Sequence, residues 1–308
     1  MSKVLAETTA DENTSRALAQ RRAERAALLA RITQTLEGDD RIAAAWLFGS
    51  IGRGEADDLS DLDLRVVVSN EYVEGICANR QAYAAQVGEA VLFQEAPQNR
   101  PVGGAFLLTL YAGEFGPQEV DWTWQPLSGA CLWPNTRILL NRVGLSSQGE
   151  MPWGYQPRPA QTPLEEAVQR VSSFWAMLLI IAKYAARSPW EDSMGLIGMS
   201  VQPLHEVSEY LGLTPRYVME NLPPHVRPQE KVRLLRGLAD EMEALMPAVE
   251  ARGGHVPGLP CRTRAAFWTW WGRSRRAKQC PRTAFKPSKP NISIRGPKCI
   301  GHSDHSRP

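Results

Sequence analysis

The residues best suited to chemistry are two aspartates, Asp61 and Asp63, which follow a Gly-Ser turn at Gly49 and Ser50. On a β-strand, side chains two residues apart point to the same face, so the two carboxylates lie side by side. Neighbouring carboxylates repel each other unless a cation accompanies them. Carboxylate oxygens suit Mg²⁺, which proteins bind through one or two carboxylates together with substrate phosphates. The spacing therefore predicts a magnesium site that receives a phosphorylated substrate.

The turn and a third aspartate extend this prediction. Gly49 and Ser50 stand where an apolar run from Ile42 to Phe48 ends. A missing Cβ lets a ligand approach the backbone closely, and N–H groups with a hydroxyl can hold phosphate oxygens. Asp121 alternates with apolar residues in a later strand, so it joins the pocket if the two strands are neighbours. Three carboxylates beside a phosphate-binding turn predict metal-assisted nucleotidyl transfer.

The elements that must position these residues divide the chain in two. Apolar periodicity and turn residues predict the following order: a helix over 12–37, strands over 42–48 and 61–68, a helix over 71–87, and strands over 90–94, 104–110 and 118–124. A Pro- and Gly-rich stretch over 144–163 is the candidate linker. Thr162 and Glu165 then form a T-x-x-E capping box that begins a long apolar helix reaching about Tyr184. Further helices are expected over 200–211 and 228–250.

This order predicts an α+β fold, a small mixed-sheet domain over 1–145 followed by an all-α domain over 160–250. The remaining 251–308 segment has 13 Lys and Arg against one acidic residue, whereas the whole chain has a net charge of only +2. Five widely spaced cysteines favour a reducing compartment. The N-terminus carries no signal-peptide pattern and no stretch is long enough to span a bilayer. We therefore expect a cytoplasmic protein with no membrane contact.

The segment GSIGRGEADDLSDLDL resembles the Gly-Ser and D-x-D pattern of the nucleotidyltransferase superfamily typified by DNA polymerase beta. It is most similar to the form found in bacterial aminoglycoside nucleotidyltransferases. The resemblance implies a mixed-sheet nucleotidyltransferase domain, a helical domain and an active site between them. It also implies transfer of a nucleoside monophosphate, usually AMP from Mg-ATP, to a hydroxyl group.

The resemblance assigns roles residue by residue. Asp61 and Asp63 would bind Mg²⁺, Gly49 and Ser50 would hold the triphosphate, and Lys183 would neutralise triphosphate charge. Asp121 would be the third carboxylate, as metal ligand or as general base.

One position departs from the family. Some members take their general base from a glutamate one turn before the helical-domain lysine, and this chain has Leu179 there. We therefore expect Asp121 to be the base, with Glu119 as the second choice.

The acceptor and the C-terminal segment leave alternatives open. An acidic body favours a small polycationic acceptor such as an aminoglycoside, which would make the protein an antibiotic-resistance enzyme. The alternatives are an enzyme that modifies tRNA or a toxin-type protein, and a non-catalytic protein that binds nucleic acid through its basic tail. For 251–308 we favour a disordered extension or a frameshift product over a nucleic-acid-binding module.

Overall fold

The computed structural model describes residues 2–146, 160–187, 194–222 and 227–257. The central feature is a six-stranded mixed sheet with the order β3-β4-β5-β2-β1-β6. The strands are β1 (Ile42–Leu47), β2 (Leu62–Val68), β3 (Ala90–Gln94), β4 (Ala105–Tyr111), β5 (Gln118–Pro126) and β6 (Arg137–Asn141). Only β2 and β5 run parallel, and every other neighbouring pair is antiparallel. The predicted α+β class is confirmed.

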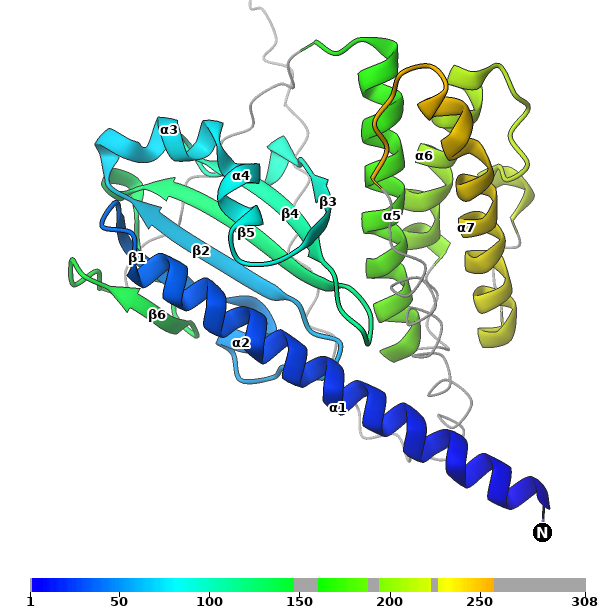
Figure 1. Ribbon diagram of the computed structural model, residues 1–308, viewed down its shortest axis with the longest axis horizontal. Coiled ribbons are helices and arrows are strands. Elements are labelled where there is room, and N and C mark those ends of the chain that lie inside the picture. Colours follow the sequence, from blue (N-terminus) through cyan, green and yellow to red (C-terminus); the bar gives the residue numbers. More distant parts are fainter. Residues whose placement is uncertain (1, 147–159, 188–193, 223–226, 258–308) are drawn as a thin grey trace, which may run out of the picture.

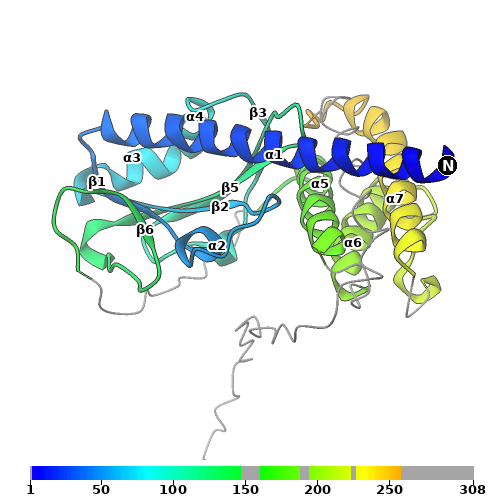
Figure 2. The same ribbon diagram turned by 90° about the horizontal axis from the view of Figure 1, so that it is seen from below.

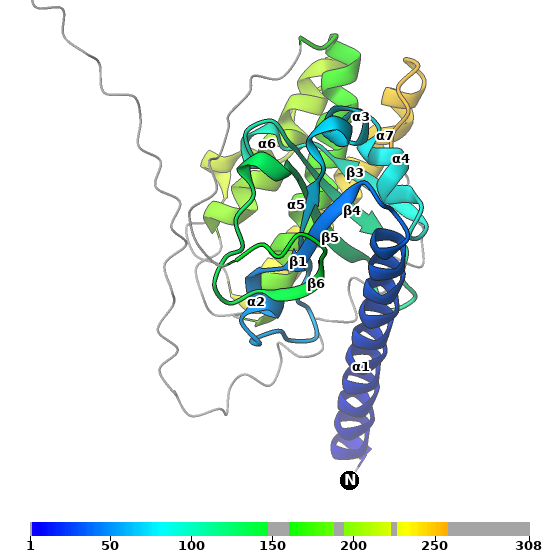
Figure 3. The same ribbon diagram turned by 90° about the vertical axis from the view of Figure 1, so that its left-hand side faces the viewer.

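One face of the sheet is a hydrophobic layer covered by helices (Figure 1). The covering helices are α1 (Ser2–Glu37), α3 (Val73–Ala78) and α4 (Arg80–Ala85). Alternation along the strands supplies the apolar side: Leu64, Val66, Trp122 and Trp124 are fully buried there. In the view of Figure 3, α1 and α4 lie to the same side of the strands. The opposite side of β2 and β5 therefore carries the polar residues.

The second part of the chain is a helical bundle made of α5 (Pro163–Arg187), α6 (Met194–Leu211) and α7 (Pro228–Glu250). It stands beside the β3–β4 end of the sheet (Figures 1 and 2). Phe106 and Leu108 of β4 share one core cluster with Phe174 and Leu178 of α5. This shared apolar core fixes α5 against the edge of the sheet.

The N-terminus of α5 has the capping box that the sequence predicts. The backbone N–H of Thr162 donates to Glu165 Oε2 at 2.7 Å, and the backbone N–H of Glu165 donates to Thr162 Oγ1 at 3.3 Å. Reciprocal bonds of this kind satisfy helix N–H groups that lack a partner within the helix.

Several boundaries differ from the sequence predictions. The first helix begins at Ser2, before the predicted start at residue 12. The single helix predicted over 71–87 is broken at Asn79 into α3 and α4. Strand β6 and the short helix α2 (Gly49–Gly52) are not predicted at all. The strand β6 is an edge strand with mostly exposed or half-buried residues, so it shows no apolar alternation that could identify it.

Two predictions concern parts of the chain that are not described. Most of the predicted linker, residues 147–159, and most of the basic segment, residues 258–308, lie outside the described residues. The boundaries at 145, 160 and 250 therefore stay predictions. In the ranges that the structure describes, no helix combines the length and apolar character needed to cross a membrane.

Candidate active site

Four carboxylates meet where β2 and β5 begin. The parallel pairing places Asp63 directly opposite Asp121 and Leu62 opposite Val120. Asp61 immediately precedes Leu62, so it lies at the level of Glu119 on the neighbouring strand. Because β2 and β5 alternate in phase, these side chains share the face that is turned away from the hydrophobic layer. This register places Asp121 beside the aspartate pair, and its role in a site stays a prediction.

Lys183 of α5 is the cation that accompanies the carboxylates. Its Nζ lies 2.7 Å from Asp61 Oδ2 and 2.6 Å from Glu119 Oε2. The side chains of Lys183 and Glu119 are each only 2% exposed. Burial opposes the charge on Lys183, but the Glu119 and Asp61 carboxylates outweigh it, so its pKa is raised. The bridge is therefore a charged one, and it joins the helical bundle to the sheet.

Lys183 and the buried Arg21, whose charge also acts on Glu119 and Asp61, do not balance four acids. Burial also opposes ionisation of Asp61, yet Lys183 holds its pKa below the ordinary value. Asp63 behaves in the opposite way: burial, then the Asp61 and Glu119 carboxylates, raise its pKa to about 7. The pKa of Asp121 is raised well above its ordinary value by burial, Glu119 and Asp63. The second carboxylate pair thus remains short of positive charge.

The backbone of Gly49 lies directly against the Asp63 carboxylate. Its φ is +61°, and a Cβ built on its backbone would collide with Asp63 Oδ2. The backbone N–H of Phe48 donates to the carbonyl of Asp63 at 3.0 Å, which joins the turn to β2. The neighbouring Ser50 Oγ is buried and has no hydrogen-bond partner in the described ranges. A glycine is required here by both the backbone conformation and the space.

The loop before Asp61 is held from two sides. Arg25 of α1 donates from Nη1 to the carbonyls of Asp57 and Ser60, at 2.8 and 2.6 Å. Arg187 of α5 binds the Asp57 carboxylate with Nε and Nη2, at 2.7 and 2.8 Å. Such paired guanidinium contacts fix geometry as well as charge. The loop therefore positions Asp61 from both parts of the molecule.

The structure brings together the predicted residues Asp61, Asp63, Asp121, Gly49, Ser50 and Lys183. It gives Glu119, the second-choice base, a different contact and adds Arg187. Glu119 holds Lys183, and Arg187 holds the aspartate loop. A signal for Arg187 exists in the sequence, because residues four apart on a helix share a face and Arg187 follows Lys183 by four. Nothing in the sequence pairs Lys183 with Glu119.

Arg53, considered in the same motif, makes an ion pair with Glu55 at 2.7 Å and is exposed.

The donor set fits a hard divalent cation. Asp121 Oδ1 is buried and lacks a hydrogen-bond partner among the described residues, and Asp63 faces an excess of negative charge. Carboxylate oxygens are the ligands that Mg²⁺ prefers. In the described part of the chain, no group of three or more His, Cys, Asp or Glu side chains is arranged so that it could hold a metal ion without some movement of the side chains. Asp63, Asp121 and Asp61 are the residues that would hold the ion.

Comparison with known proteins assigns this region to a family. Residues 30–93 match the family model described as polymerase beta, nucleotidyltransferase. The match covers β1, the Gly49–Ser50 turn, the aspartate pair on β2 and the strand β3. Residues 30–93 therefore carry the pattern of a nucleotidyltransferase domain, which supports nucleotidyl transfer as the activity.

Comparisons with solved structures and with curated proteins do not extend the family match. Among solved structures, the STING-associated CdnE c-di-GMP synthase from Capnocytophaga granulosa is similar, with 11% sequence identity, 85% of this chain and 80% of that chain covered, and a TM-score of 0.23. A TM-score this low does not define which parts correspond. A search of curated proteins gives no match.

Replacing Gly49 by Ala tests the close approach to Asp63. Gly54 is the matched control, because it also has a positive φ, of +73°, but a Cβ placed there would meet no atom within 4 Å. We expect Gly54→Ala to cost about 1–2 kcal/mol of unfolding free energy, the ordinary cost of a left-handed conformation. Gly49→Ala should cost more and abolish nucleotidyl transfer. Urea denaturation and an activity assay measure both, and equal effects of the two substitutions would contradict the assignment.

Replacing Lys183 by Met tests the bridge. Removing one partner leaves Glu119 and Asp61 buried with unbalanced charge, so we expect a loss of about 3–5 kcal/mol in unfolding free energy. The control is Arg187→Met, whose ion pair with Asp57 is one-third exposed. Pairs exposed to solvent contribute about 0.2–1 kcal/mol, so this loss should be smaller. Chemical denaturation of the two variants gives the comparison, and similar losses would show that Lys183 is not the dominant contact.

Proposed function

We propose that the protein is a Mg²⁺-dependent adenylyltransferase that moves AMP from ATP to a hydroxyl group of a small polycationic acceptor such as an aminoglycoside. The observation that carries the proposal is the register of β2 and β5, which sets Asp63 against Asp121 beside Asp61 and the Gly49 turn. The family match over residues 30–93 covers the same turn and aspartate pair.

The nucleotide would bind along the Gly49–Ser50 turn. The missing Cβ of Gly49 lets the Asp63 carboxylate lie against the turn, and the buried Ser50 hydroxyl has no partner in the described structure. Bound Mg²⁺ would neutralise negative charge on the triphosphate oxygens during transfer. Asp61 and Asp63 would hold it, next to Asp121. Most of the remaining rate enhancement in phosphoryl transfer comes from positioning, which the two anchored strands provide.

Asp121 is the proposed general base. The acceptor oxygen would attack the α-phosphorus, the bond from that phosphorus to the oxygen bridging the β-phosphate would break, and pyrophosphate would leave. Asp121 Oδ1, buried and without a hydrogen-bond partner in the described residues, would take the hydroxyl proton. A raised pKa makes a carboxylate a stronger proton acceptor. Glu119 is bound to Lys183 and almost inaccessible, so we assign it to holding that lysine.

The charge of the site supports a cationic acceptor. Four carboxylates gather here, and burial, together with the neighbouring carboxylates, raises the pKa values of Asp63 and Asp121. A polycationic molecule would be attracted to such a surface, and an anionic acceptor such as RNA would be repelled. Pyrophosphate release from Mg-ATP across a panel of aminoglycosides tests the proposal. Turnover with tRNA and with none of the aminoglycosides would overturn the acceptor class.

Asp61→Asn and Asp63→Asn should each abolish pyrophosphate release while the far-ultraviolet circular dichroism stays unchanged. Each substitution removes a metal-binding charge from a side chain with nearly the same shape. Asp58→Asn is the control, since Asp58 belongs to the same loop but pairs with Arg22 at 3.6 Å. If Asp63→Asn retained near wild-type turnover at saturating Mg²⁺, the metal assignment would be wrong.

Asp121→Asn separates the two roles of the third carboxylate. A general base acts in the transition state, so its loss should lower kcat by about 10²–10⁴-fold with little change in the KM for ATP. A metal ligand would instead raise the Mg²⁺ concentration needed for half-maximal activity. Steady-state kinetics at several Mg²⁺ concentrations distinguish these results, and unchanged kinetics would remove Asp121 from the site.

A further inference from the structure

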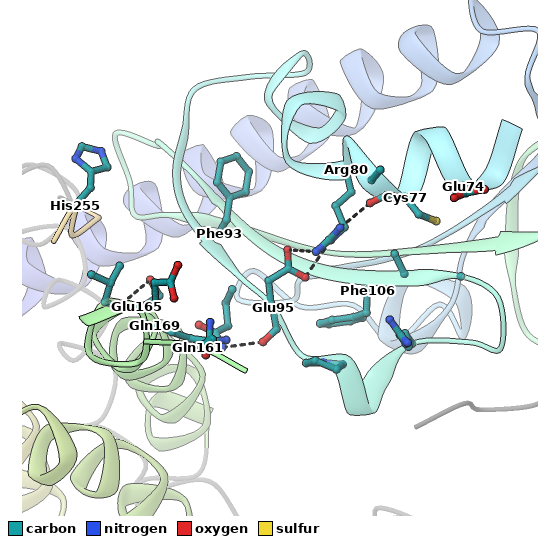
Figure 4. Close-up of a pocket in the computed structure, with 18 of the residues that line it drawn as sticks. Glu74, Cys77, Arg80, Phe93, Glu95, Phe106, Gln161, Glu165, Gln169 and His255 are labelled. Carbon is teal, nitrogen blue, oxygen red and sulfur yellow. Dashed lines mark hydrogen bonds and ion pairs between the residues drawn. The ribbon is translucent and has the colours of Figure 1, made fainter. Parts of the chain in front are cut away.

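A cavity, here called the seam cavity, lies between the sheet and the helical bundle. Its volume is about 1060 Å³, which is large enough to hold a drug-sized ligand. The sheet side contributes residues of α3, β3 and β4, among them Phe93 and Phe106. The bundle side contributes the first turns of α5, among them Gln169, together with His255 (Figure 4). Both parts of the molecule therefore form its wall.

This cavity is separate from the carboxylate site. Gln169 and Lys183 both belong to α5, and their 14-residue separation corresponds to about 21 Å along the helix axis. None of the four clustered carboxylates lines the cavity, and neither does Gly49 or Ser50. A ligand here would not occupy the place of either proposed substrate.

Three buried polar atoms on the wall have no hydrogen-bond partner among the described residues. They are Gln94 Oε1, Gln169 Oε1 and Arg100 Nη2. Gln94 is only 7% exposed, so solvent reaches it poorly. A buried polar group without a partner costs about 1–3 kcal/mol, and a bound molecule could remove that cost. The side-chain oxygens of Gln94 and Gln169 could each accept a hydrogen bond from a ligand, and the Arg100 guanidinium could donate one.

The other charges of the wall restrict the ligand further. Arg80 and Glu95 neutralise each other, with Nη2 and Oε1 2.7 Å apart (Figure 4). Glu165 accepts from Thr162 in the capping box. Glu74 adds a further carboxylate to the wall, and Arg100 is the remaining arginine of the described wall, which is too little positive charge for a triphosphate. The large share of apolar surface, including Phe93 and Phe106, disfavours a strongly polar polycation.

We propose that this seam cavity binds a small zwitterion with an apolar side group, its amino group donating to Gln94 and Gln169 and its acidic group accepting from Arg100. The apolar group would lie against Phe93, Phe106 and Val168. Amino-acid-like molecules have this combination of groups. Such a ligand would be an effector, since it contacts neither the aspartates nor the nucleotide turn.

The test uses three probes that share a phenyl ring: L-phenylalanine, phenethylamine, which lacks the acid, and 3-phenylpropionate, which lacks the amine. Binding to the full-length protein is measured by titration calorimetry and ligand-observed NMR. We expect L-phenylalanine to bind with a Kd of about 1 mM or lower, and each single-function probe to bind about three- to tenfold more weakly. Equal binding of all three, or binding of none, would overturn the proposal.

Variants locate the site. Gln169→Leu removes one acceptor and should weaken L-phenylalanine binding about three- to tenfold, whereas Val168→Trp should fill the cavity and abolish it. Gln86→Leu, an exposed position outside the cavity, should bind normally. Basal pyrophosphate release and circular dichroism confirm that each variant is folded. Competition by Mg-ATP, or loss of binding in Asp63→Asn, would place the probe in the carboxylate site and overturn the proposal. Since the readout is binding, failure of the proposed function leaves this result interpretable.

Discussion

The arrangement of the whole molecule depends on an excess of buried negative charge. Four acids are forced together because two parallel strands, β2 and β5, pair in a register that sets Asp63 against Asp121 and Asp61 beside Glu119. The strands cannot slip by one residue to relieve this, since a slip would move Leu64 and Trp122 out of the hydrophobic layer. Burial of the apolar face of β2 and β5 therefore keeps the four carboxylates together on the opposite face, where they repel one another.

Lys183 relieves part of that repulsion, and in doing so it determines where the helical bundle stands. A buried ammonium with two carboxylates at 2.6–2.7 Å cannot be lost without leaving unbalanced charge in a site that water hardly reaches. One turn later, Arg187 fixes the loop that leads into Asp61. Helix α5 therefore contributes Lys183 to the site and, through Arg187, holds the loop that precedes Asp61. Lys183 does not contact Asp63 or Asp121, which would lie at the divalent cation in the function proposed above.

The two ends of α5 have different surroundings. Its C-terminal end meets the carboxylates, and its N-terminal end borders the seam cavity with its unpartnered Gln169 oxygen. Between these ends, Phe174 and Leu178 pack against Phe106 and Leu108 of β4 in a common core.

The sequence by itself determined the local chemistry. The D-x-D spacing puts Asp61 and Asp63 on one face of a strand, alternation in 118–124 separates Asp121 from Trp122 and Trp124, and the capping box starts α5. These features depend on neighbours within a few residues, so period and residue type suffice to predict them. Tertiary structure alone decided that β5 lies next to β2, that Glu119 stands opposite Lys183, and that a cavity opens between β4 and α5. Those contacts join residues far apart in the chain, 64 positions in the case of Lys183 and Glu119, and they result from strand order and helix packing, which no local pattern encodes. The edge strand β6 escaped prediction because its exposed residues show no apolar alternation and pairing with β1 decides it. The helix break at Asn79, whose side chain donates to the Gly75 carbonyl at 2.9 Å, is local but leaves no mark in the apolar period.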